Sequence, residues 1–182
     1  MHIFKILPFI LLSFVLSAAS AAETNQFKDP YKYFFNDSWG DFHEELAIAR
    51  EQNKKAILIF FEMDECPFCH WMKENVLNHP QVQAYFRQHF LNFAVDIEGD
   101  VEMTDFQGNA TTQKQFASKN RVRATPVFAI FDLHGKQIAR YTGRTRNMEE
   151  FMWLGEYVVD GYFDKMSFSK FKRIKKRQKQ AS

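Results

Sequence analysis

The sequence predicts an α/β domain, a β-sheet flanked by helices. Two observations lead to this fold class. Segments with helical periodicity alternate with short apolar runs, in the order helix, strand, helix, strand, helix, strand, strand, helix. The run Ala56–Phe61 is apolar throughout, which is typical of a strand covered on both faces. The chain after residue 21 has about 160 residues, enough for one domain with its own core.

Helix, strand, helix and strand are predicted in the first half of the chain after residue 21. Phe42, Leu46 and Ala49 recur at helical spacing and define one face of an amphipathic helix. A later helix is interrupted at Pro80, because proline lacks the N–H that a helix interior needs. The predicted elements are a helix over Asp41–Asn53, the strand Ala56–Phe61, a helix after the cysteines that resumes over Val82–Phe90, and a strand over Leu91–Ile97.

A loop, a helix, a hairpin and a closing helix are predicted in the second half. The turn from Asp132 to Gly135 separates two apolar runs, which is typical of a β-hairpin. Phe151, Leu154 and Val158 define the inward face of the closing helix. The predicted elements are a loop over Gly99–Ala110, a helix over Thr111–Asn120, strands over Pro126–Phe131 and Gln137–Tyr141, and a helix over Met148–Val159.

The N-terminus has the three-part pattern of a secretory signal peptide. A short basic start, Met1–Lys5, precedes the apolar run Ile6–Leu16, and small residues follow over Ser17–Ala22. The apolar run is shorter than the ~20 residues that span a bilayer, which favours cleavage over a membrane anchor. We therefore predict a signal peptide over residues 1–21 and a periplasmic location, where disulfides form and persist.

The two cysteines of the chain stand in Cys66-Pro67-Phe68-Cys69, shortly after the predicted strand. At a helix N-terminus, unpaired N–H groups and the helix dipole stabilise a thiolate at Cys66. Pro67 suits the first helical position, and Cys69 is expected to be the more buried partner. The motif predicts thiol–disulfide exchange, in which Cys66 is the nucleophile and Cys69 resolves the mixed disulfide. The alternative is a structural disulfide, but its loop is too short to stabilise a fold much.

Cys66, Cys69 and His70 also match the Cys-x-x-Cys-His signature of covalently attached haem. In that alternative both cysteines form thioethers, His70 is one axial ligand, and Met103 or Met148 is the other. The apolar strand before the motif argues against a small helical cytochrome, so no cofactor is predicted. The remaining histidines lack metal-ligand spacing, and no metal site is predicted.

The apolar strand, the cysteine motif and Ala124-Thr125-Pro126 before a hairpin resemble the thioredoxin superfamily over residues 39–162. The resemblance implies a thioredoxin-like fold with a mixed central sheet over residues 22–164, thiol-disulfide oxidoreductase activity and a cis bond at Pro126. Such a bond turns the Thr125 backbone outward, where it can pair with a substrate strand. The implied site residues are Cys66 and Cys69 as catalytic, and Thr125, Pro126, Pro67 and Phe68 as substrate-binding.

A closer similarity is to exported thioredoxin-like proteins that accompany sulfur oxidation and periplasmic redox systems. It rests on Thr104-Asp105-Phe106, on Val122–Phe131 and on residues 157–162. It implies a reductase of protein disulfides in the periplasm, with a membrane protein as electron donor or acceptor. One departure bears on mechanism. Thioredoxins have a buried carboxylate six residues before the first cysteine, whereas this chain has Phe60 there, and Glu62 is the nearest acid.

Charge is distributed unevenly along the chain. The C-terminal tail, residues 165–182, holds eight of the 24 basic residues and no acidic ones, while the rest of the mature chain has 15 basic and 22 acidic residues. We expect a solvated tail, with a weak contact to an anionic membrane surface as the alternative. An exported protein with an acidic body is not expected to bind nucleic acid.

Phenylalanine is abundant, with 21 residues. Most are expected in the core or the signal peptide, and some near Cys66 in an apolar docking surface. This composition leaves a non-catalytic alternative open: a binding module or holdase whose function survives loss of both cysteines.

Overall fold

The computed structural model describes residues 26–181, and the predicted signal peptide over residues 1–21 lies outside them. Helices and strands alternate through most of this range. The elements are α1 (Pro30–Tyr33), α2 (Phe42–Glu51), β1 (Ala56–Glu62), α3 (Pro67–Met72), the π-helical η1 (Lys73–Leu77), α4 (Pro80–His89), β2 (Phe90–Asp96), β3 (Glu102–Thr104), β4 (Ala110–Thr112), α5 (Gln113–Lys119), β5 (Val127–Phe131), β6 (Gln137–Thr142), α6 (Met148–Val159), the 3₁₀-helical η2 (Tyr162–Asp164) and α7 (Phe168–Ala181).

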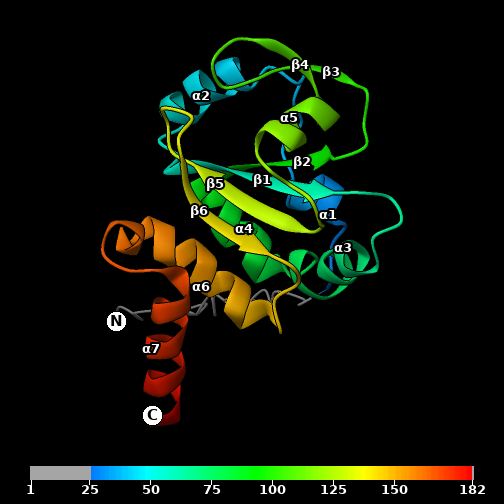
Figure 1. The fold of residues 1–182 in the computed structure, drawn as a ribbon. Helices are drawn as coiled ribbons and strands as arrows, with labels where there is room; N and C mark the ends of the chain where they lie inside the picture. Colours follow the sequence, from blue (N-terminus) through cyan, green and yellow to red (C-terminus); the bar gives the residue numbers. More distant parts are fainter. Residues whose placement is uncertain (1–25, 182) are drawn as a thin grey trace, which may run out of the picture.

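A four-stranded mixed sheet forms the centre of the molecule, with strand order β2-β1-β5-β6 (Figure 1). β1 runs parallel to β2, with Ala56 opposite Phe90, and antiparallel to β5. β5 and β6 form the predicted hairpin. The predicted α/β architecture with a mixed sheet is therefore confirmed.

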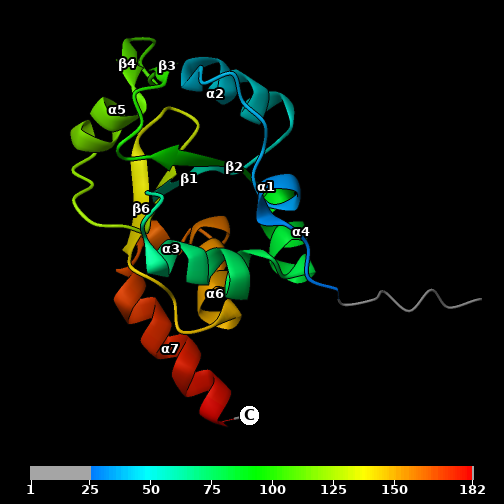
Figure 2. The same ribbon diagram turned by 90° about the vertical axis from the view of Figure 1, so that its right-hand side faces the viewer.

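Helices cover both faces of this sheet (Figures 1 and 2): α2 and α5 lie on one face, and α3, α4 and α6 on the other. All seven residues of β1 are buried. Because side chains alternate along a strand, Phe60 packs with the layer of α3, α4 and α6, while Phe61 packs with α2 and α5. Phenylalanines fill both layers, as in the stacked pair Phe86 and Phe151, whose ring centres are 4.5 Å apart. β1 is thus held on both faces by packing, and the cysteine motif that follows it lies at one end of the sheet.

Polar caps and prolines set the starts of the helices. The side chains of Asp41 and Asn147 accept hydrogen bonds from the backbone N–H groups of Glu44, at 2.9 Å, and Glu150, at 3.0 Å, at the starts of α2 and α6. Pro80 is the first residue of α4. The predicted interruption of the helix is confirmed, since a new helix begins at Pro80 after the π-helical turn.

The structure corrects the loop expected over residues 99–110. Two three-residue strands, β3 and β4, pair in it antiparallel, with Met103 opposite Thr111. The turn between them contains Gly108 at a φ of +82°, a conformation that favours glycine. Strands this short give no period-2 pattern, which explains why the sequence did not reveal them.

The structure also corrects the expectation of a solvated tail. Residues 168–181 form α7, which packs on α6, and Phe171 is buried between Tyr157 and Tyr162. Three lysines of α7 pair with glutamates of α6. These pairs are Lys172 with Glu150, Lys175 with Glu156 at 2.7 Å and Lys179 with Glu149 at 2.6 Å.

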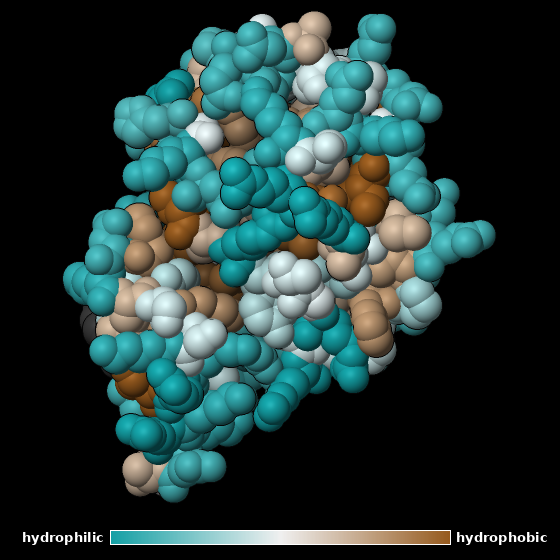
Figure 3. Space-filling model, in the orientation of Figure 1, coloured by the Kyte–Doolittle hydropathy of each residue, from teal (hydrophilic) through white to brown (hydrophobic). Residues whose placement is uncertain are grey.

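The outer side of α7 remains strongly polar. Figure 3 shows hydrophilic residues over most of the lower left region that α7 occupies in Figure 1. None of the helices within residues 26–181 combines the length and the apolar character needed to cross a bilayer.

Candidate active site

Cys66 and Cys69 form a disulfide across the first turn of α3, with their Cα atoms 5.2 Å apart. Cys66 is the N-cap residue: its Sγ accepts a hydrogen bond from the backbone N–H of Cys69 at 3.0 Å. Pro67 occupies the first helical position. Cys66 is 5% exposed and Cys69 is fully buried. The predicted placement of the motif at a helix start, with the second cysteine more buried, is confirmed.

The peptide bond between Thr125 and Pro126 is cis, as the resemblance implied. Pro126 is buried and Thr125 is half-buried. β5 begins directly after Pro126, and its Val127 lies opposite Phe61 of β1. The proline segment before β5 and the cysteine turn after β1 therefore lie at the same end of the sheet.

Next to the cysteines lies a surface of aromatic side chains with one cation. Phe68 is 54% exposed and Trp71 is half-buried. The guanidinium carbon of Arg144 lies 4.6 Å from the ring centre of Trp71 and 5.7 Å from that of Phe68. No ion pair joins Arg144 to a carboxylate of the described residues. The site thus has an exposed, positively charged group above its aromatic rings.

The loop that carries Arg144 is tied to both parts of the site. The backbone N–H of Gly143 donates to the carbonyl oxygen of Pro126 at 2.8 Å, and the backbone N–H of Thr145 lies 3.4 Å from Sδ of Met72 in α3. Sequence reasoning missed Arg144, because a lone arginine in a loop after a hairpin belongs to no motif.

His70 joins the turn before the cysteines to the helix after them. Its Nε2 lies 2.8 Å from the carbonyl oxygen of Asp64. The sulfurs of Cys66 and Cys69 are bonded to each other, and the imidazole contacts a backbone carbonyl. His70 therefore holds the turn before the disulfide against the helix that follows it.

An apolar environment surrounds the position where thioredoxins have a buried carboxylate. Phe60 is fully buried, and its ring centre lies 4.8 Å from that of Phe128 and 5.7 Å from that of Phe35. It belongs to the same core layer as Cys66 and Cys69. The layer around Cys69 therefore has an aromatic ring at this position instead of a proton-accepting carboxylate.

Glu62, two residues further along, is buried and belongs to a polar cluster with the partly buried Lys73 and the exposed Tyr31. Its carboxylate accepts hydrogen bonds from Lys73 Nζ at 2.7 Å and from the Tyr31 hydroxyl at 2.9 Å, and Lys73 also donates to that hydroxyl at 2.8 Å. Burial lowers the pKa of Lys73, but the hydrogen bonds to Glu62 and Tyr31 raise it overall above its ordinary value. Burial raises the pKa of Tyr31. This cluster fixes the end of β1 where the cysteine turn begins.

Residues 42–159 match a family model described as a thioredoxin-like domain. The chain belongs to this thioredoxin-like family. Among solved structures, the thioredoxin-like chain is similar to a thioredoxin-fold protein from Helicobacter pylori at 22% identity and a TM-score of 0.59, covering 71% of this chain and 88% of that one. It is also similar to a thioredoxin from Thermus thermophilus at 22% identity and a TM-score of 0.53, covering 70% and 88%. No curated protein matches the thioredoxin-like chain significantly.

Proposed function

We propose that this thioredoxin-like protein is a thiol-disulfide oxidoreductase that reduces disulfides of exported proteins in the periplasm. One observation carries the proposal: Cys66 caps a helix and is paired with the buried Cys69, at the end of the sheet where cis-Pro126 precedes β5. A helix N-terminus stabilises a thiolate, so the reduced form has a reactive sulfur at Cys66.

In the proposed reaction, the thiolate of Cys66 attacks one sulfur of a substrate disulfide. A bond forms between Cys66 Sγ and that sulfur, and the other substrate sulfur leaves as a thiolate and takes up a proton. Cys69 then loses its proton and attacks Cys66 Sγ, which releases the second substrate thiol. The substrate disulfide gains two electrons, and the Cys66–Cys69 pair is oxidised to the disulfide seen in the structure.

The surroundings of the cysteines support roles for Thr125 and Phe68 and bear on the route of the Cys69 proton. Thr125, next to Pro126, offers its backbone to an extended substrate segment, while the exposed ring of Phe68 provides an apolar contact. Because Phe60 replaces the carboxylate of thioredoxins, we propose that the proton of Cys69 passes to water or to the leaving substrate thiolate.

Regeneration of the dithiol requires a source of two electrons. We propose a membrane protein of the periplasmic redox systems as this donor, in keeping with the similarity to thioredoxin-like proteins of the sulfur-oxidation type and with the signal peptide predicted over residues 1–21. The exposed Lys170, Arg173 and Arg177 on α7 supply positive charge for a weak contact with anionic lipid near such a donor.

Trapping of intermediates tests the exchange reaction. We expect Cys69→Ser to accumulate mixed disulfides with exported proteins, detected on non-reducing gels and identified by mass spectrometry, because nothing then resolves them. Cys66→Ser is the matched control, which should trap no substrate through its remaining buried thiol. Undiminished function of the Cys66→Ser/Cys69→Ser protein would instead favour a binding module that uses exposed Phe68 as its docking surface.

The direction of electron flow is tested by the redox equilibrium of the protein in glutathione buffers, measured by thiol alkylation. A midpoint near the ~−270 mV of thioredoxin is expected for a reductase. A midpoint near ~−120 mV, typical of strong periplasmic oxidants, would contradict the proposed direction and leave the exchange reaction standing.

A further inference from the structure

β2 is an edge strand of the central sheet, and hydrogen bonds with Asn36 and Gln113 occupy backbone groups at two of its outward-facing residues. At Asn92, the backbone carbonyl accepts from Asn36 N–H at 2.7 Å, and the backbone N–H donates to Asn36 Oδ1 at 2.9 Å. At Asp96, the backbone N–H donates to Gln113 Oε1 at 3.1 Å. The backbone N–H and C=O groups of residues two apart in a strand point to the same edge of the sheet. The contacts at Asn92 and Asp96 therefore show that the backbone groups of alternate residues of β2 point away from β1.

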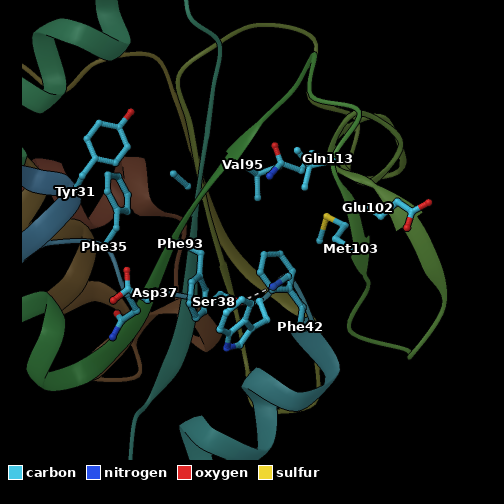
Figure 4. A pocket seen from close by; sticks show the side chains of 15 residues that line it. Tyr31, Phe35, Asp37, Ser38, Phe42, Phe93, Val95, Glu102, Met103 and Gln113 are labelled. Atoms are coloured by element: carbon cyan, nitrogen blue, oxygen red, sulfur yellow. Dashed lines mark hydrogen bonds between the residues drawn. The ribbon is translucent and has the colours of Figure 1, made fainter.

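Ala94 lies between these two closed positions. Its backbone N–H and C=O face the same outer edge, and neither has a hydrogen-bond partner there within residues 26–181. The edge opens at this residue into a pocket of about 470 Å³ (Figure 4), which we call the β2-edge pocket. An unpaired donor and acceptor on one strand residue are the groups that a second strand engages.

Aromatic and aliphatic side chains line much of the β2-edge pocket, together with polar Asn36, Ser38 and Gln113 and two carboxylates. Trp39 is fully exposed and Val101 is 64% exposed, so both offer apolar surface to an occupant. The charged side chains that line the pocket are Asp37 and Glu102, and no lysine or arginine among residues 26–181 lines it. In Figure 4 these two carboxylates lie on opposite sides of the buried Phe93 and Val95 of β2. An occupant therefore meets negative charge at both ends.

We propose that the β2-edge pocket binds an extended, basic peptide segment of a partner protein. The segment forms one β-bridge with the N–H and C=O of Ala94, places an apolar side chain against Trp39, and directs lysine or arginine side chains towards Asp37 and Glu102. The open backbone position selects an extended polypeptide, and the two carboxylates select a basic one. The pocket uses no cysteine, so the interaction is independent of the proposed redox reaction.

A peptide titration tests the proposal. The probe is acetyl-Lys-Val-Lys-Val-Lys-amide, added to the purified, ¹⁵N-labelled oxidised protein, and the matched control is acetyl-Glu-Val-Glu-Val-Glu-amide. We expect the largest amide shifts at Ala94 and at the Trp39 indole, and at least tenfold weaker binding of the glutamate peptide at low salt. High salt should weaken binding of the lysine peptide, because the two carboxylates of the pocket are exposed.

Two variants measure how much Trp39 and Glu102 contribute to the affinity for the lysine peptide, and a third serves as a control. Trp39→Ala should weaken binding of the lysine peptide about tenfold, as for an aromatic anchor, and its full exposure makes a folding defect unexpected. Glu102→Gln should weaken binding about two- to fivefold, whereas Glu51→Gln, at an exposed site on α2 outside the pocket, should leave the affinity unchanged.

Four outcomes would overturn the proposal. They are no binding of the lysine peptide, equal binding of the glutamate peptide, shifts centred on Trp71 and Arg144, and concentration-dependent shifts at Ala94 without peptide. Shifts centred on Trp71 and Arg144 would place the peptide at the disulfide. Concentration-dependent shifts at Ala94 without peptide, together with a dimer in sedimentation, would assign the pocket to a second copy of the chain.

Discussion

Lys73 and Glu62 form an ion pair that is almost buried, with side-chain exposures of 14% and 11%. Removing the Lys73 charge leaves the Glu62 carboxylate without a cation and with only the Tyr31 hydroxyl as a donor, which costs about 3 kcal/mol. We expect Lys73→Met to lower the free energy of unfolding by about that amount in urea denaturation, and Lys73→Met/Glu62→Gln to recover part of it. Lys170→Met, at an exposed site, is the control and should change stability by less than about 0.5 kcal/mol. Equal losses in the single and double variants would show that the buried charge is not the cause.

Asp105 lies in the turn between β3 and β4, where several donors stabilise its carboxylate. Burial raises its pKa, but hydrogen bonds from Lys119, Asn109 and Gln107 lower it to about 2. The pKa lies below the ~3.9 of an unfolded chain, so ionised Asp105 stabilises the fold above pH 4, and this contribution is lost as the pH falls to about 2.

The pH dependence of stability measures this contribution. We expect Asp105→Asn to be less stable by about 2 kcal/mol at pH 7 and to lose less stability between pH 4 and pH 2 than the unchanged protein. Urea denaturation across this pH range provides both values. Parallel pH profiles of the two proteins would exclude a stabilising role for the Asp105 charge.

At the scale of elements, the sequence predicted those helices, strands and turns that a local pattern of residues determines. β1 is apolar from Ala56 to Phe61, and α6 has apolar residues at helical spacing, so both were found. The cysteine turn and cis-Pro126 were found because each belongs to a short motif. Contacts between distant segments were not: Tyr31 reaches Glu62 from α1, and Arg144 reaches Trp71 from the loop after β6. No local pattern encodes such pairs.

α7 was missed as a packed element because apolar residues are few among its lysines and arginines, and one of them, Phe171, is buried. Phe171 is 4% exposed, and its ring centre lies 5.6 Å from that of Tyr157 and 4.7 Å from that of Tyr162. We expect Phe171→Ala to lower the free energy of unfolding by about 3 kcal/mol, since it removes a buried aromatic ring. Arg177→Ala on the exposed side of α7 is the control. If hydrogen exchange shows α7 to be equally protected in both variants, the ring does not hold the helix.

At the scale of the whole molecule, packing of two core layers holds the fold, and the disulfide contributes little to it. Each face of the sheet is covered by helices around its own buried cluster, and phenylalanines contribute to both clusters. The disulfide joins residues only three positions apart, a loop whose closure restricts the unfolded chain little. The proposed reaction needs this independence, because the same fold must present both the dithiol and the disulfide.

The variant Cys66→Ser/Cys69→Ser tests whether the fold is independent of the disulfide. We expect it to keep the circular dichroism spectrum of the oxidised protein, to unfold in one cooperative transition, and to lose no more than about 2 kcal/mol of unfolding free energy, while thiol–disulfide exchange is abolished. The reduced protein should show the same fold and an intact reaction. A variant that loses its cooperative transition would show that the disulfide is structural, because a redox pair that the fold requires cannot be reduced in each reaction cycle.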